Sequence, residues 1–545
     1  MKSITKIFIS SLCAVQLLAG CSKDFLDRPP LSNISVDNFY QTPGDLRLAT
    51  AALYAGKQWA DWNYTCYLPV GEVLSGNMVL GYWGDAVQLN NFAVTGMNGI
   101  MNANWAAMYR VIAQCNATIN AIETKAPASI PVANKNAAIA EAKFIRGFAY
   151  YNLAVLWGAV PVIEDNEKLI SSPLLNRIKV EDVYQFVTND LTFAAKHLPA
   201  KDATGRLTTW SAQGMLGKVY LTRSGLNQSV GTRDQALLDS AKKYAGNVCK
   251  NSGLELLPNY ADLFKTQFND NPESLFALQW VAGGGWLEGN MLQIYSPGGQ
   301  EISANGNAGW FGIRPTMDMY MQYESKDSTR RKATFMLNGD YYPELNAAGG
   351  GFTFKSNSGL KKHIIGTNKD NNSPKMNLTG SAEHNSLLRL ADVYLIYAEA
   401  ILGNNTSTSD PEALLYFNIV RRRAFFNDPY AKDEKSKVYD VTSLTGDMLI
   451  KERRVELAGE GQYWIDLVRL SYYNPSKAIQ LLGDDGTNTA ITKRVPFEYS
   501  TNGVVKPESP FGVIAPPTIG TFTFPLPSAE ITANPKLLEE PVSYY

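Results

Sequence analysis

Apolar residues recur at helical spacing along much of the chain. In segment 136–157 they form two adjoining stripes, and only Glu141, Lys143 and Arg146 leave a narrow polar edge. Two such stripes predict a helix that packs on most of its sides. The same periodicity predicts further helices at 35–54, 211–222, 234–248 and 386–402, from Asp410-Pro411-Glu412 onward, after Thr445, and at 463–470. The segments pair as helix–turn–helix units without a clean repeat, so we predict a mostly α fold, a degenerate tetratricopeptide-like solenoid of helix pairs.

Region 253–385 differs from these helical segments. It is rich in Gly, Asn and aromatic residues, in strings such as VAGGGWLEGN and NAAGGGFTF. Long loops of this kind run over the surface, do not build a core by themselves, and often carry function. We therefore predict one body at 36–545, with a helical scaffold at 36–252 and 386–475 and a large irregular, loop-rich ligand-binding region at 253–385. The Pro-rich segment 515–545 is expected to wrap this body in an extended form.

The first residues have the layout of a secretory signal. Lys2 and Lys6 precede an apolar run at 7–19, which is shorter than the roughly 20 apolar residues that span a bilayer. The string Leu18-Ala19-Gly20-Cys21 resembles a bacterial lipobox, which implies cleavage before Cys21 and attachment of lipid to its sulfur. We predict a lipoprotein signal peptide at 1–20 and a lipidated, extended leader at 21–35.

Charge and cysteine content exclude several classes of partner. The chain has 50 Lys and Arg residues and 51 Asp and Glu residues, so it lacks the excess of basic residues that would indicate a nucleic-acid partner. Besides Cys13 in the signal and Cys21, the chain has only Cys66, Cys115 and Cys249. This sparse, odd set predicts buried apolar thiols and neither a disulfide framework nor a Cys-x-x-Cys metal site.

Catalytic motifs are absent from the sequence. It has no phosphate loop, no His-Glu-x-x-His and no Gly-x-Ser-x-Gly, and its 3 histidines are His197, His363 and His384. His197 precedes Leu198-Pro199, where a helix-capping role is expected. The charged cluster at Glu452, Arg453, Arg454, Glu456 and Glu460 has spacings that build ion pairs with helix neighbours. We therefore predict no catalysis. With 51 acidic residues, however, the sequence alone does not exclude a pair of catalytic carboxylates facing each other across a cleft.

No cofactor is expected from these motifs. The loop Gly483–Asn488 offers oxygen ligands for a calcium ion, but it lacks the full spacing and terminal Glu of an EF-hand. The alternative for this loop is an ordinary polar turn, and we predict no metal site.

Tryptophans in Gly-rich turns are the best candidates for ligand binding. A sugar ring has an apolar C–H face that a flat aromatic ring covers, and a rim of hydroxyls that polar side chains bond. The candidates are Trp83 with Tyr82 and Asp85, Trp286 with Asn290, and Trp310. Gly neighbours leave such rings unshielded. The alternative is that each Trp packs its loop onto the scaffold, as we expect of the helical Trp105, Trp157, Trp210 and Trp464.

Several motifs, in order along nearly the whole chain, resemble those of the SusD/RagB lipoproteins. They are FLDRPPLSNISVDNFYQTPGDLRLATAALY, EAKFIRGFAYYNLAVLWGAVPVI, LLRLADVYLIYAEAIL, NIVRRRAF, IKERRVELAGEGQYWIDLVR and TFPLPSAEITANPKL. The chain departs from the family pattern at Tyr463, where Arg is common, and in the closing residues 540–544. The resemblance implies a helical scaffold that docks on a SusC-like TonB-dependent transporter, with the ligand site in the irregular region. It also implies that Lys23-Asp24 directs the lipoprotein to the exterior, the alternative being a solvated linker.

Together these features predict a cell-surface glycan-binding lipoprotein. It would sit in the outer membrane, anchored by lipid and facing the exterior, and would capture an oligosaccharide and deliver it to the transporter. Three alternatives remain open: a peptide-binding lid of the same kind of transporter, a lipid-anchored glycoside hydrolase, and a structural or adhesive surface protein.

Overall fold

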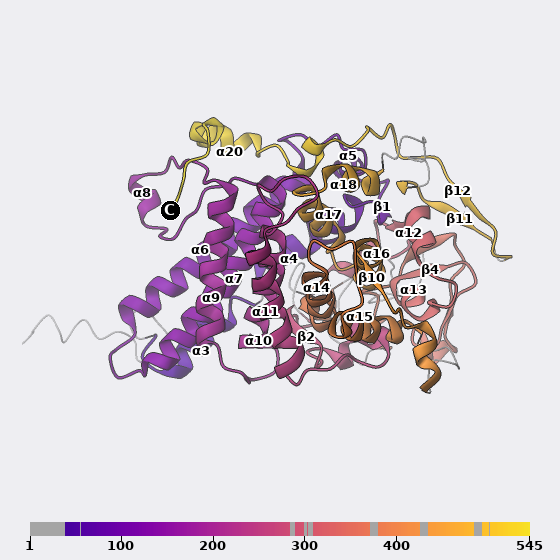
Figure 1. The fold of residues 1–545 in the computed structure, drawn as a ribbon, viewed down its shortest axis with the longest axis horizontal. Helices are drawn as coiled ribbons and strands as arrows, with labels where there is room; N and C mark the ends of the chain where they lie inside the picture. The colour runs from indigo at the N-terminus through magenta and orange to yellow at the C-terminus, as the bar shows by residue number, and fades with distance from the viewer. Residues whose placement is uncertain are drawn as a thin grey trace, which may run out of the picture.

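Long helices that pack one against the next form the centre of the molecule (Figure 1). The computed structural model describes residues 39–54, 56–283, 289–298, 302, 309–370, 380–425, 434–483, 493–500 and 502–545. Each helix of the central series contacts its successor: α6 (Gly99–Lys125), α7 (Val132–Trp157), α9 (Val180–His197), α10 (Thr209–Arg223), α11 (Gln235–Asn251), α14 (Leu390–Leu402) and α15 (Pro411–Ala424). This confirms a mostly α fold and is compatible with a solenoid of helix pairs.

Shorter helices surround this series. They are α3 (Pro43–Ala51), α4 (Lys57–Thr65), the π-helix η1 (Pro69–Val73), α5 (Gly84–Asn90), α8 (Lys168–Ser171), α16 (Gly446–Glu456), α17 (Tyr463–Ser471) and α18 (Pro475–Leu482). Trp105, Trp157 and Trp464 are buried in the main core, as predicted, and Trp210 packs at its edge. Among the helices of the described residues, none has the length and hydropathy that a membrane crossing requires.

Two helices begin where the sequence predicted, and a side chain caps each of them. Asp410 accepts hydrogen bonds from the Glu412 and Ala413 N–H groups at the start of α15, and Thr445 accepts one from Met448 N at the start of α16. The helix predicted at 386–402 begins only at Leu390, because residues 385–389 pair with another strand. The prediction did not assign α6 or α9, and α7 begins earlier than position 136.

The three charged residues of the predicted polar edge of α7 are all ion-paired; Lys143, which is half-buried, bonds Asp190 at 3.0 Å. Glu141 and Arg146 are each 2% exposed, and both side chains are ion-paired inside the protein. Arg146 Nε donates to Asp190 on α9 at 2.7 Å, and Glu141 accepts from Arg206 at 2.7 Å. These charges therefore hold α7 against its neighbours and do not form a solvated edge.

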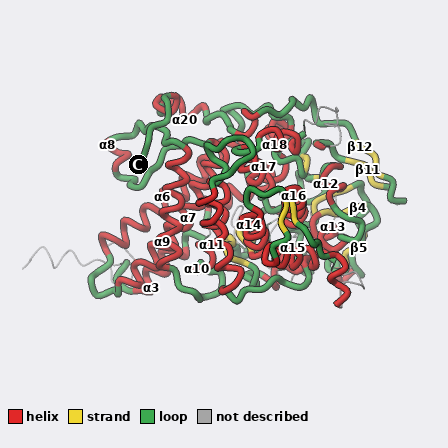
Figure 2. Tube along the Cα trace, viewed as in Figure 1, coloured by secondary structure: helices red, strands yellow, loops and turns green. Residues whose placement is uncertain are grey.

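The irregular region consists of short paired strands, short helices and loops (Figure 2). Its strands are β2 (Ser274–Leu278) paired with β8 (Asn385–Arg389), β4 (Phe335–Leu337) with β7 (Ser358–Leu360), and β5 (Tyr341–Tyr342) with β6 (Phe352–Thr353); β3 (Arg314–Pro315) pairs with β1 (Met78–Val79). It also contains α12 (Met317–Gln322), α13 (Ser328–Thr334) and the 3₁₀ turns η2 (Tyr260–Phe264), η3 (Thr266–Phe268), η4 (Leu292–Tyr295) and η6 (Ala347–Gly349).

This region does have a core of its own, contrary to the expectation from its composition. A separate buried cluster contains Ile302, Met336, Tyr342, Leu345, Phe354 and Ile364. The apolar residues that build it are scattered between glycines and polar residues, so no periodic pattern revealed them.

The C-terminal segment crosses one edge of the molecule, from the strands to the far helices (Figure 1). Its elements are β11 (Phe497–Tyr499), β12 (Val505–Pro507), η8 (Ile519–Phe522), α20 (Ser528–Ala533) and η9 (Pro535–Leu538). Three further short elements lie earlier in the chain and are not part of this segment: β9 (Ser407–Thr408), η7 (Glu434–Tyr439) and β10 (Leu444–Thr445). Phe524 N donates to Leu156 O at 2.9 Å and Val542 N donates to Arg177 O at 2.9 Å. These bonds fasten the segment to α7 and to the loop before α9.

Candidate functional site

Two aromatic turns, distant in sequence, meet at the surface beside β1 and β3. The strands pair antiparallel, with Val79 opposite Arg314. The chain that leaves β1 therefore runs beside the chain that enters β3. As a result, the Trp83 and Phe311 rings stack with centroids 5.5 Å apart and an interplanar angle of 18°.

The two turns carry four aromatic residues, two of them strongly exposed. Tyr82 is 87% exposed and Trp310 is 58% exposed. Trp83 and Phe311 are half-buried, and Phe311 also contacts Tyr295 with a centroid distance of 5.2 Å. We call Tyr82, Trp83, Trp310 and Phe311 the aromatic surface. Because Phe311 rests on the buried Tyr295 ring, the Trp83 ring that stacks on Phe311 is held by packing.

Glycines shape both turns. A Cβ on Gly309 would lie 2.3 Å from Ile294 O and 2.6 Å from Ser296 N, so only glycine fits there. The backbone approach lets Trp310 N donate to Ile294 O at 2.8 Å, which fixes the turn before β3. By contrast, a Cβ on Gly84 would have no atom within 4 Å, so the side of the turn after Trp83 is open.

The structure brings together only some of the predicted site residues. Trp83, Tyr82 and Trp310 lie on the aromatic surface. Asp85 lies in the first turn of α5 with a half-buried side chain, and its backbone oxygen accepts a hydrogen bond from Asn98 at 3.0 Å. Phe311 was not among the predicted residues, although its place next to Trp310 in a Gly-rich string was a usable signal.

Asn290 does not belong to this surface. Its side chain is fully buried, its Nδ2 donates to Glu383 O at 2.9 Å, and its Oδ1 accepts from Leu292 N at 2.9 Å. The amide therefore satisfies the backbone around η4 and has no free group for a ligand. Trp286, Cys21 and the loop residues 484–488, for which a calcium ion was considered, lie outside the described residues.

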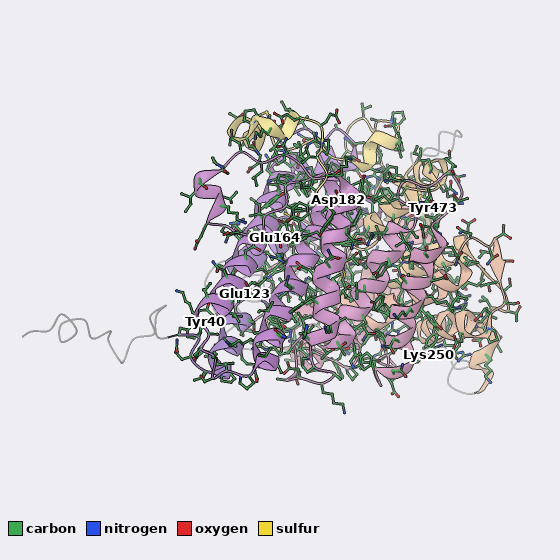
Figure 3. All side chains as sticks on the ribbon, turned by 60° about the vertical axis from the view of Figure 1, so that its left-hand side comes forward. Tyr40, Glu123, Glu164, Asp182, Lys250 and Tyr473 are labelled. Atoms are coloured by element: carbon green, nitrogen blue, oxygen red, sulfur yellow. The ribbon has the colours of Figure 1, made fainter. Side chains whose placement is uncertain are left out.

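Two grooves on the helical face differ from the aromatic surface (Figure 3). One, of about 660 Å³, is lined by Tyr40, Glu123 and Glu164, and most of its charged side chains are carboxylates. The other, of about 720 Å³, is lined by Lys250 and Tyr244 among others. The Tyr244 ring is stacked on Tyr220 with a centroid distance of 5.6 Å.

The histidines have structural partners. The buried His363 ring lies between Glu383 Oε1 at 3.0 Å and Gly459 O at 2.8 Å. His384 lies between Asp270 and Trp280 O. His197 is in the last turn of α9, where a capping role was expected, and its ring contacts Phe193. Cys66 and Cys115 are buried free thiols, as predicted, and Cys249 is half-buried.

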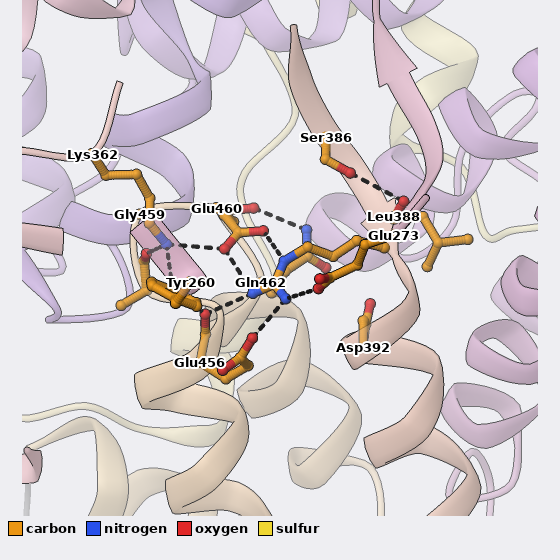
Figure 4. Close-up of polar contacts among 12 residues, drawn as sticks. Tyr260, Glu273, Lys362, Ser386, Leu388, Asp392, Glu456, Gly459, Glu460 and Gln462 are labelled. Carbon is orange, nitrogen blue, oxygen red and sulfur yellow. Dashed lines mark hydrogen bonds and ion pairs between the residues drawn. The ribbon is translucent and has the colours of Figure 1, made fainter. Parts of the chain in front are cut away.

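The charged cluster at 452–460 is a buried ionic network. Arg389 at the start of α14 bonds Glu273, Glu456 and Glu460 at 2.6–2.8 Å. Lys362 of the irregular region bonds Glu460 at 2.9 Å (Figure 4). The predicted ion-pairing role is right, but the partners come from other elements and not from the same helix.

Burial and charge oppose each other in this network. Burial raises the pKa of Glu456, but the charges of Arg423, Arg389 and Arg330 outweigh it and hold that pKa at about 2. Because Arg330 belongs to α13 and Arg423 to α15, the network fastens the irregular region to the scaffold. Its carboxylates are engaged as structural ion-pair partners.

Comparison with known proteins finds relatives along the whole length of the chain. The model of the SusD family matches residues 272–544, and a model described as starch-binding associating with outer membrane matches residues 24–221. A SusD-like protein of Bacteroides ovatus is 39% identical over 558 aligned residues, which cover 100% of this chain and 98% of the relative.

Solved structures agree. One is a crystal structure with xylogluco-oligosaccharide, whose chain is 36% identical to this one and aligns with a TM-score of 0.81. The alignment covers 92% of this chain and 99% of that chain. A SusD homolog from Bacteroides thetaiotaomicron shares the fold. It is 19% identical and aligns with a TM-score of 0.70 over 94% of this chain and 99% of its own. The resemblance in the sequence motifs is thereby confirmed, and the chain belongs to the SusD family.

Proposed function

We propose that this protein binds oligosaccharide at its surface through Tyr82, Trp83, Trp310 and Phe311. The observation that carries the proposal is the stacking of Trp83 on Phe311 beside two strongly exposed rings. Such rings cover the apolar face of a pyranose and leave its hydroxyls to polar groups and water. The related structure with xylogluco-oligosaccharide supports a glycan over a peptide as the ligand.

Binding of this kind is expected to be modest in affinity. A surface turn buries only part of a ligand, and the immobilisation of a flexible oligosaccharide opposes association. The aromatic rings cost little to order, because Phe311 is already packed on Tyr295 and Trp83 on Phe311.

The place of this activity is the outer face of the outer membrane. The protein would be anchored through lipid on Cys21 and would pass its glycan to a SusC-like TonB-dependent transporter. Family membership and the family model described as associating with outer membrane support this assignment. No covalent chemistry is proposed, since the carboxylates of the 452–460 cluster are committed to buried ion pairs.

Calorimetric titration of the purified protein tests the proposal. The ligand panel contains xyloglucan-, β-glucan- and starch-derived oligosaccharides and a set of random peptides. We expect heat of binding for at least one glycan, no heat for peptides, and no new reducing ends after prolonged incubation. Peptide binding without glycan binding would support the peptide-binding alternative, and glycan cleavage would show an enzyme.

A further inference from the structure

Residues 493–497 contact the elements that flank both turns of the aromatic surface. We call these residues the clasp segment. On one side it reaches the ends of the segment that contains β1, Tyr82, Trp83 and α5, and on the other side it reaches β3 and α12, which follow Trp310 and Phe311. The contacts are made mainly by one side chain, Arg494, and by backbone oxygens.

Arg494 closes the segment around Trp83. Its Nε donates to Asn90 O at 2.7 Å, and its Nη2 donates to Val73 O and Leu74 O at 2.9 Å. Asn90 is the last residue of α5, and Val73 and Leu74 end η1. The guanidinium thus joins the carbonyl ends of two helices, which lack partners within their own helices.

These bonds offset only part of the cost of burying Arg494, whose Nη1 has no hydrogen-bond partner in the part of the chain that the structure describes. The residue is 1% exposed, and among the described residues no carboxylate lies within ion-pair distance of it. Burial, with a smaller contribution from Arg454, lowers the pKa of Arg494 to about 9. Helix carbonyl ends and the Phe92 ring, 4.1 Å from the guanidinium, supply the negative potential that a buried cation needs.

The same segment holds the second turn by its backbone. Val495 O accepts a hydrogen bond from Met317 N at 3.0 Å. Phe497 O accepts one from Arg314 Nη2 at 2.6 Å, and Arg314 is the β3 residue opposite Val79. The clasp segment therefore bonds β3 directly and holds the elements on either side of β1, while the two-residue strands have few bonds of their own.

We propose that Arg494 is a positioning residue for glycan binding. By closing the segment from Leu74 to Asn90 next to β3, it keeps Trp83 stacked on Phe311 before ligand arrives, so that less ordering opposes association. This inference rests on the proposed glycan function. It assigns to Arg494, which lies outside the aromatic surface, control over the geometry of that surface.

Arg494→Met tests the proposal by two readouts. Glycan affinity is expected to fall about tenfold, which corresponds to about 1.4 kcal/mol of binding free energy. Backbone hydrogen exchange is expected to quicken in residues 80–91 and to stay unchanged in α14. Arg494→Lys keeps the charge but lacks the branched guanidinium that reaches several carbonyls, so its loss of glycan affinity should be smaller than that of Arg494→Met. Arg422→Met, which breaks the distant Arg422–Asp440 pair on α15, is the matched control and should bind like wild type.

A double-mutant cycle separates positioning from general destabilisation. If Arg494 acts through Trp83, Arg494→Met should weaken binding less in a Trp83→Ala background than in wild type.

A folded Arg494→Met protein with wild-type affinity, or with unchanged exchange in residues 80–91, would overturn the proposal. If Arg494→Met does not fold, Arg494→Lys decides by the same criteria. If the wild-type protein binds no glycan, the proposed function fails, whereas hydrogen exchange still decides whether Arg494 holds the turn.

Discussion

Trp83 and Phe311 stack at 5.5 Å because β1 and β3 pair antiparallel, and not because the residues are near in sequence. Each strand has only two residues, so the pairing depends on what surrounds it. The clasp segment, the glycine at position 309 and the buried aromatics under Phe311 all act on this one contact. The geometry of the aromatic surface is therefore testable at positions that do not themselves touch a ligand.

Gly309→Ala should weaken glycan binding severalfold without unfolding the protein. The added Cβ would meet the backbone of Ile294 and Ser296 at 2.3–2.6 Å, so the turn that carries Trp310 must move. Gly84→Ala is the matched control on the other turn, where no atom lies within 4 Å of the new Cβ. Calorimetric titration of both variants measures the effect. Equal affinities for the two variants would show that the tight turn at 309 is not needed.

Arg389→Met should destabilise the fold by about 3–5 kcal/mol, because it leaves buried carboxylates without their main partner. Glu273, Glu456 and Glu460 all bond this side chain. Lys250→Met, which breaks the exposed pair with Glu412, should cost less than about 1 kcal/mol. Urea unfolding monitored by fluorescence compares the two. Similar losses in both variants would contradict a structural role for the buried network.

The buried Glu399 should make stability depend on pH in acid. Burial raises the pKa of Glu399, but bonds from Arg469 and Arg233 outweigh this and hold it at about 2, below its ordinary value of 4.5. Because the folded-state pKa is depressed, this stabilisation is complete above pH 4.5 and is lost as pH falls toward 2.

Glu399→Gln isolates this contribution. The variant should be less stable than wild type by about 3 kcal/mol at pH 7, and the difference should shrink steadily as pH falls from about 4.5 to about 2. Urea titrations at several pH values measure it. A difference that stays constant over this range would show that Glu399 does not titrate as described.

Lipid attachment at Cys21 stays a prediction, because this residue lies outside the described part of the chain. Cys21→Ala should abolish labelling by a palmitate analogue and release the protein from the membrane fraction. Cys249→Ala, at a thiol inside the body, should leave both unchanged. A Cys21→Ala protein that remains lipid-labelled and membrane-bound would contradict the lipobox assignment.

Local patterns predicted many of the helices but not α6 or α9. Asp410 caps the helix that it was predicted to cap, and a helix begins after Thr445 as predicted, since helix starts depend mainly on neighbouring residues. The longest helix, α6, was not assigned because buried Asn104 and Asn116 interrupt its apolar face. Whether a polar residue on a helix is buried and paired depends on tertiary neighbours that periodicity does not reveal.

The candidate site could be predicted only in part. Gly-rich turns correctly indicated exposed aromatics at Tyr82 and Trp310, because this signal is local. The contact of Trp83 with Phe311 depends on a non-local strand pair too short to show alternation. The same limit applies to Asn290, whose polar side chain suggested the surface but is used by the backbone near η4.

The central claim is that the aromatic surface binds glycan, and the Trp83→Ala/Trp310→Ala double variant tests it most directly. Titration with a xyloglucan-derived oligosaccharide should show binding to wild type and a loss of about 2 kcal/mol, or roughly thirtyfold in Kd, in the variant. Tyr545→Ala, at an exposed ring beside α9, is the control and should bind like wild type. A double variant that folds normally and binds the oligosaccharide with wild-type Kd would contradict the account.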